Sequence, residues 1–152
     1  MTITGWQYVA RDMGAERLFR GIVLAAIASV VLGVGSARTA AAQTSVWDGV
    51  FTLAQAARGE QTFERACTAC HDTGEFSGAR FRLSWVGQSA GDLFDTISTL
   101  MPEGDPGSLS PGEYAALVAF LFRLNGYPSG EVSLPADPRV LGMVQIKESN
   151  QQ

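Results

Sequence analysis

Cys67, Cys70 and His71 are the residues whose types and spacing point most directly to chemistry. They form the pattern Cys-x-x-Cys-His, and the chain contains no other cysteine and no other histidine. On a short helical turn, two thiols at this spacing reach the two vinyl groups on one edge of a porphyrin, and the adjacent imidazole lies over the iron. The motif predicts one haem c, attached covalently through Cys67 and Cys70, with His71 as its proximal iron ligand.

Other uses of these two cysteines fit the sequence less well. A redox-active dithiol does not need the histidine, and the surrounding sequence lacks the βαβ context of thioredoxin. A structural zinc site usually takes four Cys or His ligands, whereas this chain supplies three. A disulfide between Cys67 and Cys70 would close a small loop with little stabilising effect. A haem-free dithiol function is the alternative that stays open.

A second axial ligand is needed on the other side of the iron. Methionine is the usual soft, neutral partner of histidine, and it favours Fe(II). Met101 lies at a predicted helix end before Pro102, on a segment able to fold over the opposite haem face. Met143 lies in an apolar strip near the end of the sequence, where a packing role fits better. Met101 is the predicted distal ligand, with an open or Met143-bound iron as the alternative.

Phe81, Leu83 and Trp85 are predicted to form part of the haem pocket wall. They alternate with polar residues within 72–88, a segment whose glycines and serines predict a loop, with a brief strand as the alternative. Core packing without haem contact is the alternative for each of the three. Arg82, with Arg80 and the Trp85 indole, is a candidate partner of the haem propionates, although an arginine taken alone is more often solvated.

Three helices are predicted to position these residues: 53–66 after the N-cap Thr52, 90–100 after the N-cap Ser89, and 111 to about 125 after the N-cap Ser110. The first ends at the Cys-x-x-Cys-His motif and the second ends at Met101. Gly59 in the first helix is explained if the wide apolar face of the last helix crosses there. Within the tail, residues 139–146 are predicted to pack as a strand-like strip.

Residues 1–42 are predicted to be a secretory signal peptide that is cleaved. Arginines precede an uncharged apolar run over 21–35, and Ala40, Ala41 and Ala42 offer small residues for a signal peptidase. A retained membrane anchor is the alternative, but the run is shorter than the ~20 residues that span a bilayer. The sequence then divides into the signal (1–42), a haem domain (43–128) and a partly packed tail (129–152).

The exported chain is acidic. From residue 43 onward it has seven basic and 13 acidic residues, a net charge of −6. It therefore offers no basic stripe for nucleic acid, and its charge suits steering toward a basic partner surface. Covalent haem attachment in bacteria takes place outside the cytoplasmic membrane, so we expect a periplasmic protein without a stable membrane anchor.

Further segments complete a family pattern around the haem motif: Ser45–Val50, Ala57–Glu60, Leu100–Pro102, Pro106–Leu109, Glu113–Tyr114, Ala119–Leu121 and Asn125–Pro128. With these segments, residues 43–152 resemble the class I monohaem cytochromes c. The resemblance is strongest to small periplasmic cytochromes, and cytochrome domains, associated with quinoprotein alcohol dehydrogenases. It implies an all-α class I cytochrome c fold, with three to four helices wrapped around one covalently bound haem.

The resemblance implies an electron carrier rather than an enzyme. Its iron, held by His71 and Met101, would cycle between Fe(III) and Fe(II). The donor would be a periplasmic dehydrogenase, by resemblance a quinoprotein, and the acceptor a cytochrome or a terminal oxidase. The alternatives are a haem-bearing subunit of a larger quinoprotein-type dehydrogenase complex and an open-site haem enzyme or ligand sensor. The lack of a distal histidine counts against the open site.

The sequence departs from the family pattern in the loop after the motif. Family members commonly have glycine after the histidine, and a later proline whose carbonyl accepts the proximal imidazole proton. Position 72 is Asp, and no proline occurs between His71 and Met101. The sequence therefore leaves the acceptor of that proton unassigned, although such hydrogen bonds tune the ligand and the potential.

Overall fold

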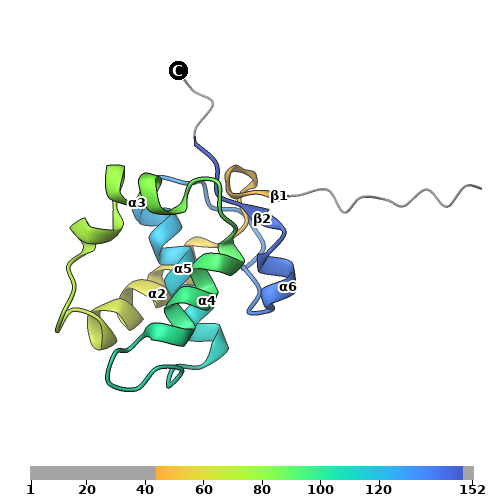
Figure 1. Ribbon diagram of the computed structural model, residues 1–152. Coiled ribbons are helices and arrows are strands. Elements are labelled where there is room, and N and C mark those ends of the chain that lie inside the picture. Colours follow the sequence, from red (N-terminus) through yellow and green to blue (C-terminus); the bar gives the residue numbers. More distant parts are fainter. Residues whose placement is uncertain (1–43, 149–152) are drawn as a thin grey trace, which may run out of the picture. The chain divides into compact units, whose positions relative to one another are not determined.

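The computed structural model describes residues 44–148, and the predicted signal peptide lies outside them (Figure 1). Helices dominate this part of the chain, and none of those described is long and apolar enough to cross a membrane. The elements in chain order are β1 (Thr44–Ser45), η1 (Val46–Asp48), α2 (Leu53–Ala66), η2 (Thr73–Phe76), α3 (Gly78–Trp85), α4 (Ala90–Leu100), α5 (Pro111–Leu124), α6 (Pro138–Leu141) and β2 (Val144–Gln145).

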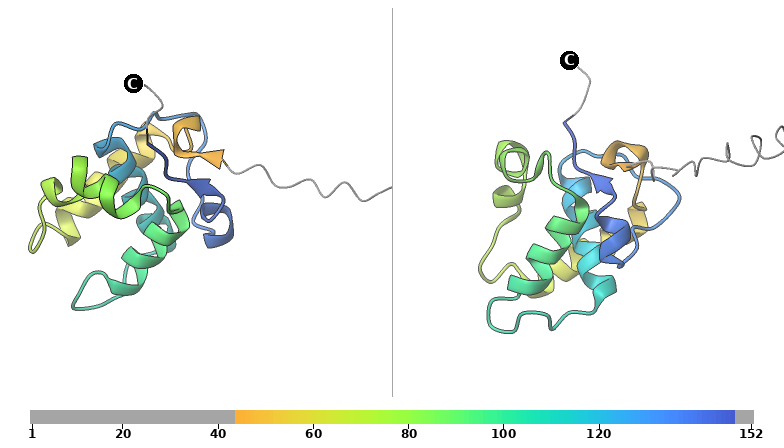
Figure 2. Two further views of the ribbon diagram at one scale, coloured as in Figure 1. Left: turned by 45° about the horizontal axis from the view of Figure 1, so that its top comes forward. Right: turned by 45° about the vertical axis from the view of Figure 1, so that its right-hand side comes forward.

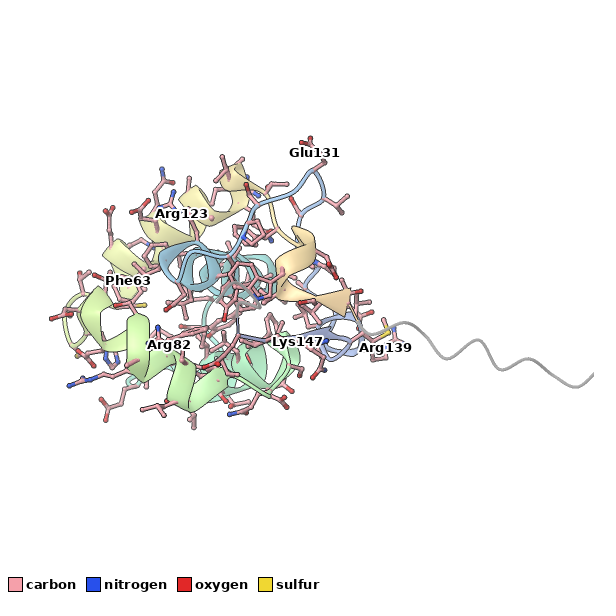
Figure 3. The ribbon with its side chains drawn as sticks, turned by 90° about the horizontal axis from the view of Figure 1, so that it is seen from above. Phe63, Arg82, Arg123, Glu131, Arg139 and Lys147 are labelled. Carbon is pink, nitrogen blue, oxygen red and sulfur yellow. The ribbon has the colours of Figure 1, made fainter. Side chains whose placement is uncertain are left out.

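The crossing of α2 and α5 is the centre of the fold (Figure 1). At Gly59 the two backbones approach so closely that an added Cβ would lie 1.8 Å from the carbonyl oxygen of Ala116. One turn further along α2, the Phe63 ring packs on Phe120 at a centroid distance of 5.4 Å. Figure 3 shows Arg123 beside α2, where its guanidinium pairs with Glu60. The predicted crossing of the first and last helices is confirmed.

Side-chain caps fix where the three predicted helices begin. The Thr52 hydroxyl accepts from the Gln55 N–H of α2 at 3.1 Å. The other two helices begin with capping boxes, formed by Ser89 and Asp92 at α4 and by Ser110 and Glu113 at α5. Hydrogen bonds from the Ser89 backbone and hydroxyl hold the pKa of Asp92 below its usual value, so the capping carboxylate is charged at neutral pH. The predicted starts of all three helices are confirmed.

The segment 72–88 is helical, and its prediction as a loop or brief strand is wrong. It contains the turn of 3₁₀ helix η2 and the two-turn helix α3. The alternation of Phe81, Leu83 and Trp85 suggested a strand period, but three residues are too few to distinguish it from a helix. On a helix, positions 81 and 85 share one face and position 83 lies opposite. Phe81 is accordingly buried, whereas Leu83 is 89% exposed.

The tail after Pro128 joins the same hydrophobic core as the helices. The buried Gln55 side chain exchanges two hydrogen bonds of 2.8 Å with the backbone of Leu134. Instead of the predicted strand-like strip, the chain forms the short helix α6 and then β2, which pairs in parallel with β1 (Figure 2). Leu141 and Ile146 on either side of that pairing are fully buried. The tail therefore closes one side of the domain.

Candidate functional site

An apolar cavity of about 510 Å³ contains the residues that the sequence singled out for haem binding. Its volume is in the range of small-molecule and cofactor sites, roughly 300–1,000 Å³. Cys67, Cys70, His71 and Met101 all line it. The views in Figures 1 and 2 agree that the segment after α2 and the loop after α4 lie at one end of the α2–α5 pair. The fold thus brings the motif and the methionine, 30 positions apart, to one site.

The motif forms a compact turn at the carboxyl end of α2. The Cys67 N–H donates to the Phe63 carbonyl at 2.8 Å and so completes the last helical turn. The Cys67 carbonyl then accepts from the N–H groups of Cys70 and His71 at 3.1 and 3.0 Å. Both thiols are free, with Cys67 partly buried and Cys70 exposed. This turn places the two sulfurs and the imidazole on one cavity, as covalent haem attachment requires.

Burial alters the acidity of the inner thiol. Loss of hydration raises the pKa of Cys67 above its ordinary value, and the nearby Arg65 guanidinium offsets only part of the rise. Reactive dithiols instead have lowered thiol pKa values, because the thiolate is the nucleophile. The environment of Cys67 therefore does not activate this thiol as a nucleophile.

Met101 is held at the end of α4 by backbone and side-chain hydrogen bonds. Its N–H donates to the Ile97 carbonyl at 2.9 Å, and its own carbonyl accepts from the Tyr114 hydroxyl at 2.8 Å. The same hydroxyl lies 3.4 Å from the N–H of Leu109, at the far end of the loop. Tyr114 is buried on α5, so it anchors both ends of the methionine loop to the core of the domain.

Tyr114→Phe should loosen the methionine loop without unfolding the domain. The variant keeps the buried ring and leaves the Met101 carbonyl without its hydroxyl donor, a loss of about 1 kcal/mol. In the haem-loaded protein we expect added imidazole to displace the methionine at a roughly fivefold lower concentration. Titration at the far-red absorption band measures this displacement. An unchanged imidazole affinity would show that Tyr114 does not restrain the loop.

The structure separates the four residues of this segment that were predicted to contact the haem. Trp85 lines the cavity, whereas Phe81, Leu83 and Arg82 are not among its lining residues. The predicted wall positions of Phe81 and Leu83, and the predicted role of Arg82 toward the propionates, are therefore not supported. Phe81 is buried in the core next to Tyr127, at a ring-centroid distance of 6.2 Å. Arg82, labelled on α3 in Figure 3, lies near Tyr127 and opposes the rise in that residue's pKa caused by burial. Leu83 projects away from the core because it lies on the opposite face of α3.

Sequence reasoning missed most of the apolar lining. These residues come from helix faces that the sequence identified as apolar but did not assign to a cofactor, and from η2. The helical spacing of i, i+4 and i+7 on α4, and i, i+4 on α5, was the available signal. The missed apolar residues are Phe63, Ala66, Phe76, Leu93, Ile97, Leu100, Leu117 and Leu121.

The residues around the cavity fit a c-type haem. Two free thiols at one edge match two vinyl groups, and an imidazole and a thioether supply an axial donor pair suited to iron. The helices contribute a largely apolar wall, which a porphyrin would cover. Cys67 and Cys70 would hold the group covalently, and His71 and Met101 would bind its iron.

A family model described as "Cytochrome C oxidase, cbb3-type, subunit III" matches residues 54–121. The matched segment begins in α2, includes the Cys-x-x-Cys-His motif and Met101, and ends in α5. Together with the helical architecture, the match confirms the predicted all-α class I cytochrome c fold. It also supports a class I monohaem cytochrome c, for which covalently bound haem c is implied. The comparisons with curated proteins and with solved structures returned no match.

Proposed function

We propose that this protein, which has the class I cytochrome c fold, is a periplasmic electron carrier with one haem c. The observation that carries the proposal is the convergence of Cys67, Cys70, His71 and Met101 on one apolar cavity. A covalent haem c accounts for two free thiols, a histidine and a methionine that line one cavity. In this role the protein would transfer electrons between a dehydrogenase and a cytochrome or terminal oxidase.

The chain's own residues suit electron transfer without substrate chemistry. A bound haem supplies the one-electron Fe(III)/Fe(II) couple. Apolar side chains from α4 and α5, such as Leu93 and Leu117, exclude water from the cavity and keep its dielectric constant low. Met101 favours the reduced state as a soft ligand, and Tyr114 holds its loop in place. Filling both axial positions would leave no site on the metal for a substrate.

The mouth of the cavity supports weak docking to redox partners. Several lining residues are themselves exposed, among them Cys70, Glu103 and Leu100, which is 58% exposed. Small, transient interfaces of less than ~1,200 Å² are typical of electron-transfer encounters. The acidic chain would be steered toward a basic surface on its partner. The proposed partners are a periplasmic dehydrogenase, of the quinoprotein type that the sequence resembles, and a cytochrome or oxidase acceptor.

An absorption spectrum of the exported protein tests the proposal. The protein should be made in a host that attaches haem c, and measured oxidised and reduced. We expect a c-type spectrum that survives denaturation, because the haem is bound covalently, and a far-red band in the oxidised protein from methionine ligation. A Cys67→Ser, Cys70→Ser double variant should lose the covalent haem. A wild-type protein without haem would contradict the proposal and favour the dithiol function.

A second candidate is that the protein serves as a subunit of a larger redox complex. The matching family is described as an oxidase subunit, and the sequence resembles cytochromes associated with quinoprotein dehydrogenases. Purification from the native host under mild conditions distinguishes the two. A stable large catalytic partner would favour the subunit, and a free haem protein of the size of this chain would favour the independent carrier.

A further inference from the structure

Glu75 is the hydrogen-bonding partner of the predicted proximal ligand. One oxygen of its carboxylate, Oε2, lies 3.2 Å from Nδ1 of His71. A histidine that binds a metal through one ring nitrogen nearly always donates a hydrogen bond from the other, and that bond fixes its tautomer and orientation. We propose that Glu75 is a positioning residue that directs His71 to bind iron through Nε2 and lowers the reduction potential of the site. The inference rests on the proposed haem function.

The carboxylate is held in place from its other side. Oε1 of Glu75 accepts from the Asp72 N–H at 3.1 Å, within the capping box of η2. Glu75 therefore presents its carboxylate to the imidazole in a defined orientation.

The turn that carries Glu75 is tied to α5. The Asn125 side chain donates to the Phe76 carbonyl at 2.8 Å and accepts from the Gly78 N–H at 3.0 Å. The Phe76 ring packs edge-on against the His71 imidazole, with centroids 5.2 Å apart. Contacts from α5 thus fix η2, and η2 places both a ring and a carboxylate against His71.

A negatively charged acceptor makes the imidazole a stronger electron donor than a neutral acceptor would. Stronger donation stabilises Fe(III) more than Fe(II), and so lowers the reduction potential. Since the Glu75 side chain is 41% exposed, solvent screens part of its charge. The expected effect is therefore modest, a factor of about two to five in the equilibrium constant for reduction.

Three haem-loaded variants test the inference by potentiometric titration. Glu75→Gln removes the charge and keeps the shape, whereas Glu75→Asp keeps the charge but shortens the reach to Nδ1. Both should raise the reduction potential, with the two- to fivefold effect in Glu75→Gln. Glu64→Gln is the matched control, because Glu64 is exposed near the motif and its carboxylate makes no hydrogen bond within the described residues. The reduction potential of Glu64→Gln should change by less than that of Glu75→Gln.

A second measurement reports on the hydrogen bond itself. In nuclear magnetic resonance spectra of the reduced protein, the His71 Nδ1 proton should exchange with solvent more slowly in the wild type than in Glu75→Gln and Glu75→Asp. Equal shifts of potential in the Glu75 and Glu64 variants, or unchanged proton exchange, would overturn the inference and leave the electron-carrier function intact. A wild-type protein without covalent haem would overturn both.

Discussion

Gly59→Ala should destabilise the domain by on the order of 3–5 kcal/mol, near the upper end for a single substitution. The added Cβ would lie 1.8 Å from the Ala116 carbonyl oxygen and 2.4 Å from its carbon. These are backbone atoms of a packed helix, so they cannot rotate away as a side chain could. α2 and α5 would have to separate, and Phe63 and Leu117, which line the cavity, would move with them. Denaturant unfolding of the haem-loaded protein measures the loss.

Gly112→Ala provides the matched control on α5. Gly112 lies in the first turn of α5, and a Cβ there meets nothing within 4 Å. The variant should be neutral or more stable by up to about 1 kcal/mol, because alanine restricts the unfolded chain and favours the helix. A Gly59→Ala variant as stable as the wild type would contradict the close backbone contact between α2 and α5.

Met101→Ala should keep the covalent haem and lose its distal ligand. Cys67 and Cys70 are unchanged, so the haem stays attached. Loss of the thioether removes the preference for Fe(II), and the reduction potential should fall by on the order of 0.1 V, a modest part of the range that axial ligands cover. The far-red band should disappear, and the reduced protein should bind carbon monoxide. Spectroscopy and potentiometry on the same sample measure all three effects.

Met143→Ala is the control for this experiment. Met143 is 39% exposed and is not among the cavity-lining residues, so its loss should leave the spectrum and the potential unchanged. The opposite pattern, with the band lost in Met143→Ala and retained in Met101→Ala, would assign the distal position to Met143. A wild-type protein that binds carbon monoxide tightly would favour the open-site alternative.

The helices that could be predicted are those whose start signals are local. Thr52, Ser89 and Ser110 each cap their own helix, and the apolar stripes that follow are long enough to establish a helical period. The two short helices, α3 and α6, were missed for the opposite reason. Four to eight residues do not establish a period, and these helices are held largely by contacts with distant segments, such as that of Phe81 with Tyr127. Tertiary packing rather than local preference determines them.

The same distinction between local signals and tertiary packing applies to the residues of the candidate site. Cys67, Cys70 and His71 are contiguous, so their shared chemistry is visible in the sequence. Met101 followed from the need for a soft ligand and from its place at a helix end. Which residues line the cavity depends on how whole helices are rotated, and the sequence alone did not determine that for Leu83. Glu75 was missed because the carboxylate reaches His71 only once η2 has formed.

The pairing of β1 with β2 bears on the order in which the domain assembles. Its two strands are about 100 positions apart. Closing so long a loop in an unfolded chain costs on the order of 4 kcal/mol in conformational entropy. The hydrogen bonds of a two-residue ladder stabilise the pairing by less than that. The ladder should therefore form after the α2–α5 crossing has shortened the loop, and it should be the first part to open. The Thr44 N–H, bonded to the Met143 carbonyl at 3.0 Å, should then exchange with deuterium sooner than the amides of α5, with the ends of the domain opening while its helical centre stays closed.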